Sequence, residues 1–331
     1  MRNFALVLRL AAAGALAAGA LAAATDPPPP WAFPVNPPGW QRWSGDDTVM
    51  HVPGSSAAYT WKQVMDRMNV PDWHPNEHPP LPENVAHGKP PDGYACGYCH
   101  LPSGMGRPEN ASVAGLPAAY IIEQTAAFKD GTRKCSQPNM DPPAHMVAVA
   151  KAATDDEVRI AAAYFSSLKL KPWIRVVESD TVPKTTVSGN MLVPSKAGGT
   201  EPIGERIIEM PENVEREELR DTDSGFVAYV PVGSIEKGGV LVTTGGARVE
   251  GGRIVAGQTI QCGICHGADL KGLGNVPALA GRSPSYIVRQ LYDMQHGTRT
   301  GPGADLMKAV VANLSIEDMV SIAAYTASLA P

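Results

Sequence analysis

Two short cysteine motifs constrain this chain more than any other feature of its sequence. Both follow the pattern C-x-x-C-H, and they read Cys96-Gly97-Tyr98-Cys99-His100 and Cys262-Gly263-Ile264-Cys265-His266. Two thiols one helical turn apart can add to the two vinyl groups on one edge of a porphyrin, and the histidine after the second cysteine then reaches the iron. The motifs therefore predict two covalently bound haem c groups, with iron ligands His100 and His266 and attachment through Cys96, Cys99, Cys262 and Cys265.

Two other kinds of site use paired cysteines, and neither fits this chain. A thioredoxin-like redox site needs a strand-to-helix setting, which the Gly- and Pro-rich flanks of the motifs do not supply. Structural zinc sites place their cysteine pairs about 15–20 residues apart, whereas 166 positions separate Cys96 from Cys262. The fifth cysteine, Cys135, is expected to be a partly buried free thiol.

The sequence around the first motif is repeated around the second. A tyrosine lies 20 residues after each motif histidine, at Tyr120 and Tyr286, and the glycine of a Gly-Thr-Arg triplet follows each tyrosine after 11 residues. Each copy ends in a helix announced by a capping box, Thr154-x-x-Glu157 before residues 158–168 and Ser315-x-x-Asp318 before residues 319–329. The chain therefore contains a duplicated helical domain.

A helix before each motif is needed to cross the C-terminal helix and close the haem pocket. The candidates are residues 59–68 and 234–243, and the second contains Gly238-Gly239, although a glycine costs roughly 1 kcal/mol in a helix interior. Residues 248–255 alternate around a Gly-Gly pair, which predicts a small inserted hairpin.

One axial position of each iron remains, and the repeat indicates a methionine for it. Met146 lies 18 residues before Tyr164, and Met307 lies 18 residues before Tyr325. Methionine is usually a core residue, so alternatives stay open at the first haem: Met140, and His145, which would give bis-histidine ligation. In the second half, Met294 is interpreted as packing.

With these features, residues 59–168 and 233–330 resemble the class I cytochromes c, particularly the tandem two-haem cytochromes of bacterial periplasms. The resemblance implies that His100 and Met146 hold the first iron and that His266 and Met307 hold the second. The chain departs from an even repeat at one place, because the glycine-to-methionine interval is five residues longer in the first half and includes Cys135 and Pro138. We therefore expect the two haems to differ in reduction potential.

The N-terminus predicts export. Arg2 and Arg9 come before an apolar stretch, residues 10–24, that ends in three alanines and precedes proline-rich sequence, as in a cleaved signal peptide. Removal of residues 1–24 leaves 26 basic against 33 acidic residues, a balance that argues against nucleic acid as a partner. Localisation in the periplasm follows.

The chain as a whole is expected to be all-α, with two class I cytochrome c domains in tandem. The predicted segments are a signal peptide (1–24), a proline-rich arm (25–56), a first cytochrome c domain (57–171), a connector (172–232) and a second cytochrome c domain (233–331). The connector, rich in proline, is expected to be extended, with short strands at residues 174–177 and 226–230 and a solvated mixed-charge patch at residues 212–223.

Ligation by histidine and methionine fills both axial positions and raises the reduction potential. Such an iron has no open position for peroxide or oxygen. The sequence therefore predicts an electron carrier, not an enzyme, that exchanges single electrons with redox partner proteins, among them a membrane-bound or periplasmic oxidoreductase. Two alternatives stay open: a dihaem enzyme of the peroxidase or thiosulfate-oxidising type, and an electron-transfer subunit of a dehydrogenase complex.

Overall fold

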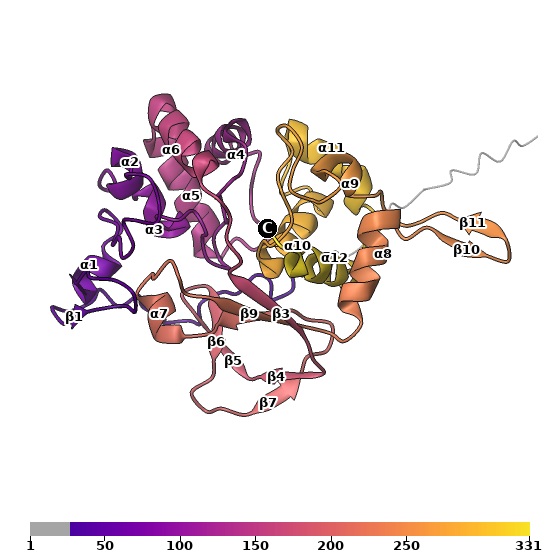
Figure 1. Ribbon diagram of the computed structural model, residues 1–331, viewed down its shortest axis with the longest axis horizontal. Helices are drawn as coiled ribbons and strands as arrows, with labels where there is room; N and C mark the ends of the chain where they lie inside the picture. Colours follow the sequence, from indigo (N-terminus) through magenta and orange to yellow (C-terminus); the bar gives the residue numbers. More distant parts are fainter. Residues whose placement is uncertain (1–26) are drawn as a thin grey trace, which may run out of the picture.

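The computed structural model describes residues 27–331, so the predicted signal peptide, residues 1–24, lies outside the described residues. Within residues 27–331, no helix combines the length and the apolar character that crossing a membrane requires. Two helical lobes lie side by side above a small connector built largely of strands (Figure 1).

The two lobes share the succession of a motif helix and three longer helices. The first lobe has a short helix, the motif helix and three longer helices: α2 (Glu83–Ala86), α3 (Cys96–His100), α4 (Ala118–Asp130), α5 (Asp141–Ala152) and α6 (Asp155–Ser167). The second lobe has α8 (Ser234–Thr244), α9 (Gly263–His266), α10 (Pro284–Gln295), α11 (Pro302–Val311) and α12 (Ile316–Ser328). The helical fold expected for the two domains is confirmed.

Both predicted capping boxes form at the last helix of each lobe. The hydroxyl of Thr154 accepts from the backbone N–H of Glu157 at 3.3 Å, and the Glu157 carboxylate accepts from the backbone N–H of Thr154 at 2.9 Å. The same two bonds join Ser315 and Asp318, each at 3.1 Å. These bonds satisfy N–H groups that an uncapped helix leaves without partners.

In the second lobe, α8 crosses α12 as the sequence predicts. A Cβ atom at Gly238 would overlap the carbonyl oxygen of Ser321, and one at Gly239 would lie 3.3 Å from the ring of Tyr325. Lys237 adds ion pairs to Glu317 and Asp318 at 2.8 and 2.9 Å. The glycine pair therefore serves close helix packing, which offsets its low helix propensity.

The first lobe departs from the second at this helix, and the prediction for residues 59–68 is wrong. They form strand β2 (Tyr59–Thr60), which pairs with β1 (Val49–Met50), and the five-residue helix α1 (Trp61–Met65). The helix ends because the Asp66 side chain binds the backbone N–H of Met68 at 2.8 Å, a local bond that competes with helix continuation. Instead, α2 lies against α6, where Asn84 donates to the carbonyl of Glu157 at 2.8 Å.

The connector folds into small sheets and contains the two predicted strands. A three-stranded sheet has the order β3 (Ile174–Glu178), β9 (Phe226–Val230), β8 (Ile208–Pro211), with β3 and β9 parallel and β8 and β9 antiparallel. Two antiparallel pairs form separate sheets: β4 (Thr181–Pro183) with β7 (Thr200–Pro202), and β5 (Thr185–Ser188) with β6 (Met191–Pro194). The predicted hairpin, β10 (Arg248–Glu250) with β11 (Arg253–Val255), projects away from the second lobe (Figure 1).

The mixed-charge patch at residues 212–223 is a solvated face only in part, because Glu212, Glu215, Glu218 and Asp223 are exposed but the rest of its charges are covered. It includes α7 (Val214–Glu218), and Glu217, Arg220 and Asp221 are only 3%, 7% and 1% exposed. Each has a partner in the first lobe: Arg107 for Glu217, Tyr98 for Arg220 and His74 for Asp221. Charged side chains are buried here because they are paired, so the segment packs on the first lobe.

A reciprocal contact joins the two lobes at their Gly-Thr-Arg turns. Arg133 and Arg299 pair across an antiparallel bridge, flanked by two backbone hydrogen bonds of 2.8 Å between residues 132–134 and 298–300. Each arginine then donates to a tyrosine hydroxyl and a glutamine of the other lobe: Arg133 to Tyr286 (2.7 Å) and Gln290 (2.9 Å), Arg299 to Tyr120 and Gln124 (both 2.9 Å). The duplicated motif thus supplies both sides of the interface.

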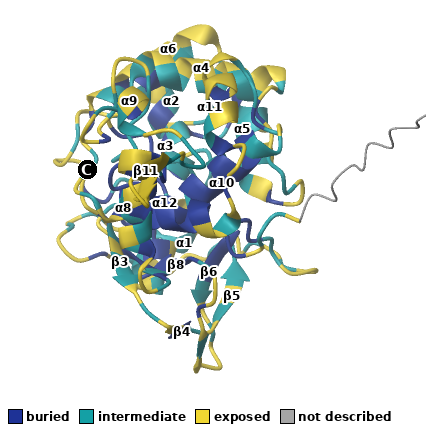
Figure 2. Ribbon diagram, turned by 90° about the vertical axis from the view of Figure 1, so that its right-hand side faces the viewer, coloured by how far each residue is buried: buried dark blue, intermediate teal, exposed yellow. Residues whose placement is uncertain are grey.

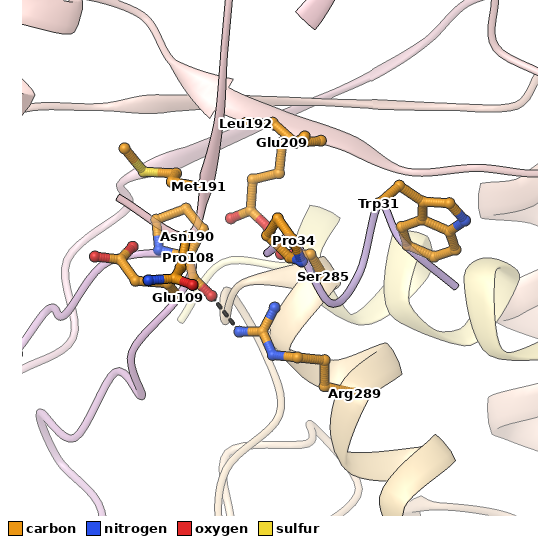
Figure 3. Close-up of a pocket in the computed structure, with 10 residues that line it drawn as sticks. All are labelled: Trp31, Pro34, Pro108, Glu109, Asn190, Met191, Leu192, Glu209, Ser285 and Arg289. Atoms are coloured by element: carbon orange, nitrogen blue, oxygen red, sulfur yellow. Dashed lines mark hydrogen bonds between the residues drawn. The ribbon is translucent and has the colours of Figure 1, made fainter. Parts of the chain in front are cut away.

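The arm and the connector meet α10 at one buried junction (Figure 3). Arg289 donates to the carbonyl of Ala32 in the arm at 2.7 Å and to that of Pro108 in the first lobe. Glu209 of β8 accepts from Ser283 and from the backbone of Ser285 at 2.7 and 3.1 Å, and burial raises its pKa. Accordingly, α10 and α12 are largely buried, whereas α4 and α6 carry much exposed surface (Figure 2).

Candidate haem sites

Each C-x-x-C-H motif forms one helical turn, α3 in the first lobe and α9 in the second. Residues three apart in a helix lie on the same face. Cys96 therefore lies on one face with Cys99, and Cys262 on one face with Cys265. None of these thiols is in a disulfide bond. This donor set fits covalent attachment of haem c at both places.

Each motif histidine is fixed by a hydrogen bond on its Nδ1 atom. His100 Nδ1 lies 2.8 Å from the carbonyl oxygen of Ala111, and His266 Nδ1 lies 2.8 Å from that of Pro277. A carbonyl can only accept, so Nδ1 carries the proton and the lone pair of Nε2 is left for a metal. Burial lowers the pKa of both imidazoles, which favours this neutral form.

The loop after each motif is held by the same backbone bonds in both lobes. Gly106 donates to the carbonyl of His100 at 2.9 Å, and Gly272 donates to that of His266 at 2.8 Å. Further on, Gly115 and Gly281 each donate at 3.0 Å to the last helix of their lobe. Both have a positive φ, near +68°, which only glycine adopts readily. The backbone around the two imidazoles is therefore held in the same way in both lobes.

The proposed sixth ligands lie on corresponding helices. Met146 is on α5 and Met307 is on α11, the helix that follows the Gly-Thr-Arg turn in each lobe, and both side chains are half-buried. Met307 packs beside the core of the second lobe. Sulfur-to-iron ligation by either residue stays a prediction.

The alternative ligands occupy different surroundings. Met140 is 1% exposed and lies in the core shared by the arm, the connector and the second lobe, so its position is that of a packing residue. His145 is half-buried and its ring contacts Tyr94 at 5.5 Å between centroids. Met294 is 8% exposed within the core of the second lobe, as interpreted from the sequence.

The five-residue excess of the first half lies against the second lobe. The backbone N–H of Ser136 donates to Asp293 at 2.9 Å, and its hydroxyl lies 2.8 Å from that of Thr298. Cys135 is a free, partly buried thiol that packs beside the core shared by the arm, the connector and the second lobe. Burial raises its pKa to about 11, so the thiol stays protonated. The longer segment therefore adds to the contact between the lobes that the Gly-Thr-Arg turns form.

Sequence reasoning missed a group of arginines near Cys99. Arg42, Arg67, Arg107 and Arg220 come from the arm, the first lobe and the connector. Burial first, and then the charges of the other three arginines, lowers the pKa of Arg42 to about 9. Burial similarly lowers the pKa of Arg220 to about 9. These residues converge from distant positions in the chain, so no local pattern in the sequence announces them.

The comparisons with known proteins agree with this geometry. No protein-family model matches the chain. Cytochrome c-554(548) of Halomonas halodenitrificans is 40% identical to it over 68 residues, which cover 82% of that protein and 20% of this chain. The chain belongs to the cytochrome c family.

Two longer relatives extend the likeness. Cytochrome c4 of Azotobacter vinelandii is 31% identical over 144 residues, 41% of this cytochrome and 66% of that protein. The thiosulfate dehydrogenase electron acceptor of Thiomonas intermedia is 26% identical over 247 residues, 72% of this cytochrome and 80% of that protein. The expected tandem cytochrome c with two covalently bound haems is confirmed, and the likeness to an electron acceptor agrees with the expected role as an electron carrier.

Proposed function

We propose that this cytochrome is exported, loses residues 1–24 and carries single electrons between redox proteins in the periplasm. The first haem is attached to Cys96 and Cys99 and the second to Cys262 and Cys265, with axial pairs His100 with Met146 and His266 with Met307. One observation supports this assignment most: in both lobes the motif histidine is held through Nδ1 by the carbonyl 11 residues later. The division into an arm (25–56), two cytochrome c domains (57–171 and 233–331) and a connector (172–232) belongs to the same proposal.

A bound haem with both axial positions filled supplies one-electron iron chemistry. The residues of the chain contribute the rest. The carbonyls of Ala111 and Pro277 hold the imidazoles in the neutral form and fix their orientation. A thioether ligand favours the ferrous state and so raises the reduction potential. Two fixed ligands per iron suit electron transfer, because no substrate needs to enter.

A periplasmic dehydrogenase is the proposed electron donor. The Thiomonas intermedia relative is named as the electron acceptor of thiosulfate dehydrogenase, and we propose a donor of the same class for this protein. A second candidate is a permanent subunit of such a dehydrogenase. The β10–β11 hairpin favours it, because Val249 and Ile254 lie opposite each other on the projecting hairpin and are 71% and 82% exposed, as at surfaces that bind partners.

Expression in a bacterium with c-type cytochrome maturation tests location, processing and attachment together. The periplasmic fraction should contain a red protein that begins at Thr25, with the mass of two haems added and a pyridine haemochrome count of two per chain. A protein retained in the cytoplasm, or one that loses its colour on extraction with acid acetone, would contradict the proposal.

The proposed electron donor is tested by mixing the oxidised cytochrome with thiosulfate, with and without a thiosulfate dehydrogenase. Thiosulfate alone should leave the oxidised protein unchanged, and thiosulfate with a purified thiosulfate dehydrogenase should reduce both haems. Co-purification of the dehydrogenase at fixed stoichiometry through high salt would favour the permanent subunit. Turnover of peroxide or thiosulfate by the cytochrome alone, at about 1 s⁻¹ or faster, would overturn the carrier role.

A further inference from the structure

The two motifs differ sharply in exposure at equivalent positions. The residue before the second cysteine is Tyr98 in the first motif and Ile264 in the second. Tyr98 is 2% exposed and Ile264 is 62% exposed. Cys99 is half-buried, whereas Cys265 is exposed. Because these cysteines mark the thioether edge of each haem, that edge is covered in the first lobe and open in the second.

The cover over Tyr98 is built by the connector and the arm. Arg220 of the connector stacks on the Tyr98 ring at 3.6 Å from its centroid, and it donates to the Tyr98 carbonyl at 2.7 Å and to its hydroxyl at 2.6 Å. Arg42 of the arm also lies over the ring, at 5.2 Å. The backbone of Arg220 has φ near +58°, a strained conformation for a residue with a side chain. The surrounding structure therefore holds Arg220 in place.

The segment that carries Arg220 is anchored on both sides. The indole N–H of Trp73 donates to the carbonyl of Leu219 at 2.7 Å, and His74 lies 2.9 Å from Asp221. Glu217 pairs with Arg107. These contacts are buried and join the connector to the first lobe, on the side where α7 lies (Figure 1). The covering segment is thus part of the folded body.

The open edge of the second lobe has an apolar border. Ile264 lies in the motif, Ile260 (47% exposed) just before it, and Leu273 (61%) in the loop that binds the His266 carbonyl through Gly272. Leu306 (80%) is on α11, which is tied to this region by the bond from Thr259 to the carbonyl of Val310 at 2.7 Å. Exposed apolar residues grouped at one place mark an interaction surface.

The charges beside this border are balanced. Lys308 pairs with Asp305 at 2.8 Å on α11, and Lys271 is accompanied by Asp269, whose carboxylate accepts from the backbone N–H of Lys271 at 3.1 Å. A membrane surface would be expected to attract a cluster of lysines and arginines, which these residues do not provide. An uncharged, apolar face of another protein is the better complement.

We propose that electrons enter and leave the protein at the second haem, where a redox protein with a neutral, apolar face docks on Ile260, Ile264, Leu273 and Leu306, while the first haem exchanges electrons through the second. This proposal rests on the proposed function as an electron carrier. It assigns the arm and the connector the task of closing the first haem to partners.

Voltammetry of the dihaem protein tests the docking face. The probe is a gold electrode coated with mixed methyl- and hydroxyl-terminated alkanethiols, an uncharged apolar surface. Ile264→Glu combined with Leu306→Glu should slow electron exchange of both haems with this surface about tenfold or more, because it puts two charges into the contact. The matched control is Ile122→Glu with Ile160→Glu on α4 and α6, two exposed isoleucines of the first lobe (36% and 50%). The control should exchange electrons like the wild type.

Equal slowing by the control pair, or unchanged rates in the Ile264/Leu306 pair, would overturn the proposal. Self-association of the wild type in sedimentation, abolished by Ile264→Glu with Leu306→Glu, would also overturn it, because the face would then bind a second copy. The haem count in solution must match the wild type in both pairs, and the exchange rates are compared at zero driving force because a new carboxylate beside the second haem lowers its midpoint potential. If soluble mediators did not reduce two haems in the wild-type protein, the proposed function itself would be contradicted.

Discussion

Gly238 and Ser321 meet so closely that no side chain fits between them where α8 crosses α12. A Cβ atom at Gly238 would overlap the Ser321 carbonyl, which cannot move without disturbing its own helix. The crossing holds together the lobe that contains the second motif.

Gly238→Ala should therefore destabilise the second lobe, although alanine is the better helix former. Overpacking costs about 1–3 kcal/mol and outweighs a propensity gain of roughly 1 kcal/mol. Chemical denaturation followed by circular dichroism measures the change. Gly239→Ala is the matched control, because its Cβ would meet only the Tyr325 ring at 3.3 Å. An equal loss in both variants would contradict the close crossing at Gly238.

Arg133→Ala should weaken the contact between the lobes. It leaves the hydroxyl of Tyr286 without its donor and removes one of the two arginine donors of Gln290, which keeps its bond from Arg299, and a buried polar group left unpaired costs about 1–3 kcal/mol. A double-mutant cycle with Tyr286→Phe isolates the pair. Arg159→Ala serves as the control, because Arg159 forms only an exposed ion pair with Asp156. Zero coupling in the cycle would rule out a stabilising bond.

Acid should weaken the second lobe through Asp318. Burial opposes its ionisation, but Lys237 and the cap of Ser315 outweigh burial and hold its pKa below the usual value. A lowered pKa gives stability that is complete above the unfolded pKa of about 3.9 and is lost as the pH falls through the folded pKa. Thermal unfolding between about pH 3 and 6 should show this loss, and Asp318→Asn should reduce it. An unchanged pH profile in the variant would refute the assignment.

Met307→Ala should remove the contribution of the second haem to the weak long-wavelength band that sulfur-to-iron ligation gives to oxidised cytochromes c, and Met146→Ala should remove that of the first. Each loss is expected because the thioether is the proposed axial ligand. Met140→Leu, which conserves volume in a buried core, should keep the full band. Loss of the band in Met140→Leu would reassign the first ligand to Met140, and a wild-type first haem without this band would point to His145.

Arg220→Gln should lower the potential of the first haem and leave the second unchanged. A positive charge near an iron favours the reduced state, which carries one positive charge fewer, so loss of a buried charge should lower the potential by roughly tens of millivolts. Potentiometric titration of both haems measures it. Arg206→Gln, on the connector beside Glu201, should change neither potential. Identical haems in the wild type would contradict the predicted difference between the two sites.

Features encoded within a few residues could be predicted from the sequence. The motifs, the capping boxes at Thr154 and Ser315 and the glycine-centred hairpin all depend on local chemistry. The helix expected at residues 59–68 failed because the Asp66 side chain stops it after five residues. The burial of Arg220 and Asp221 depends on Tyr98 and His74, more than a hundred positions away in the chain, and no local pattern reports such a contact.

The parallel pairing of β3 with β9 shortens the part of the connector that can act as a flexible link between the lobes. The chain leaves the first lobe after Ser167 and reaches β3 at Ile174, and it leaves β9 at Val230 and enters α8 at Ser234. Since the two strands are fixed in register, only these short stretches act as a tether. A short tether gives its two ends a mutual effective concentration in the millimolar range. If the contact between Arg133 and Arg299 opened, the lobes would therefore recapture each other before they could separate.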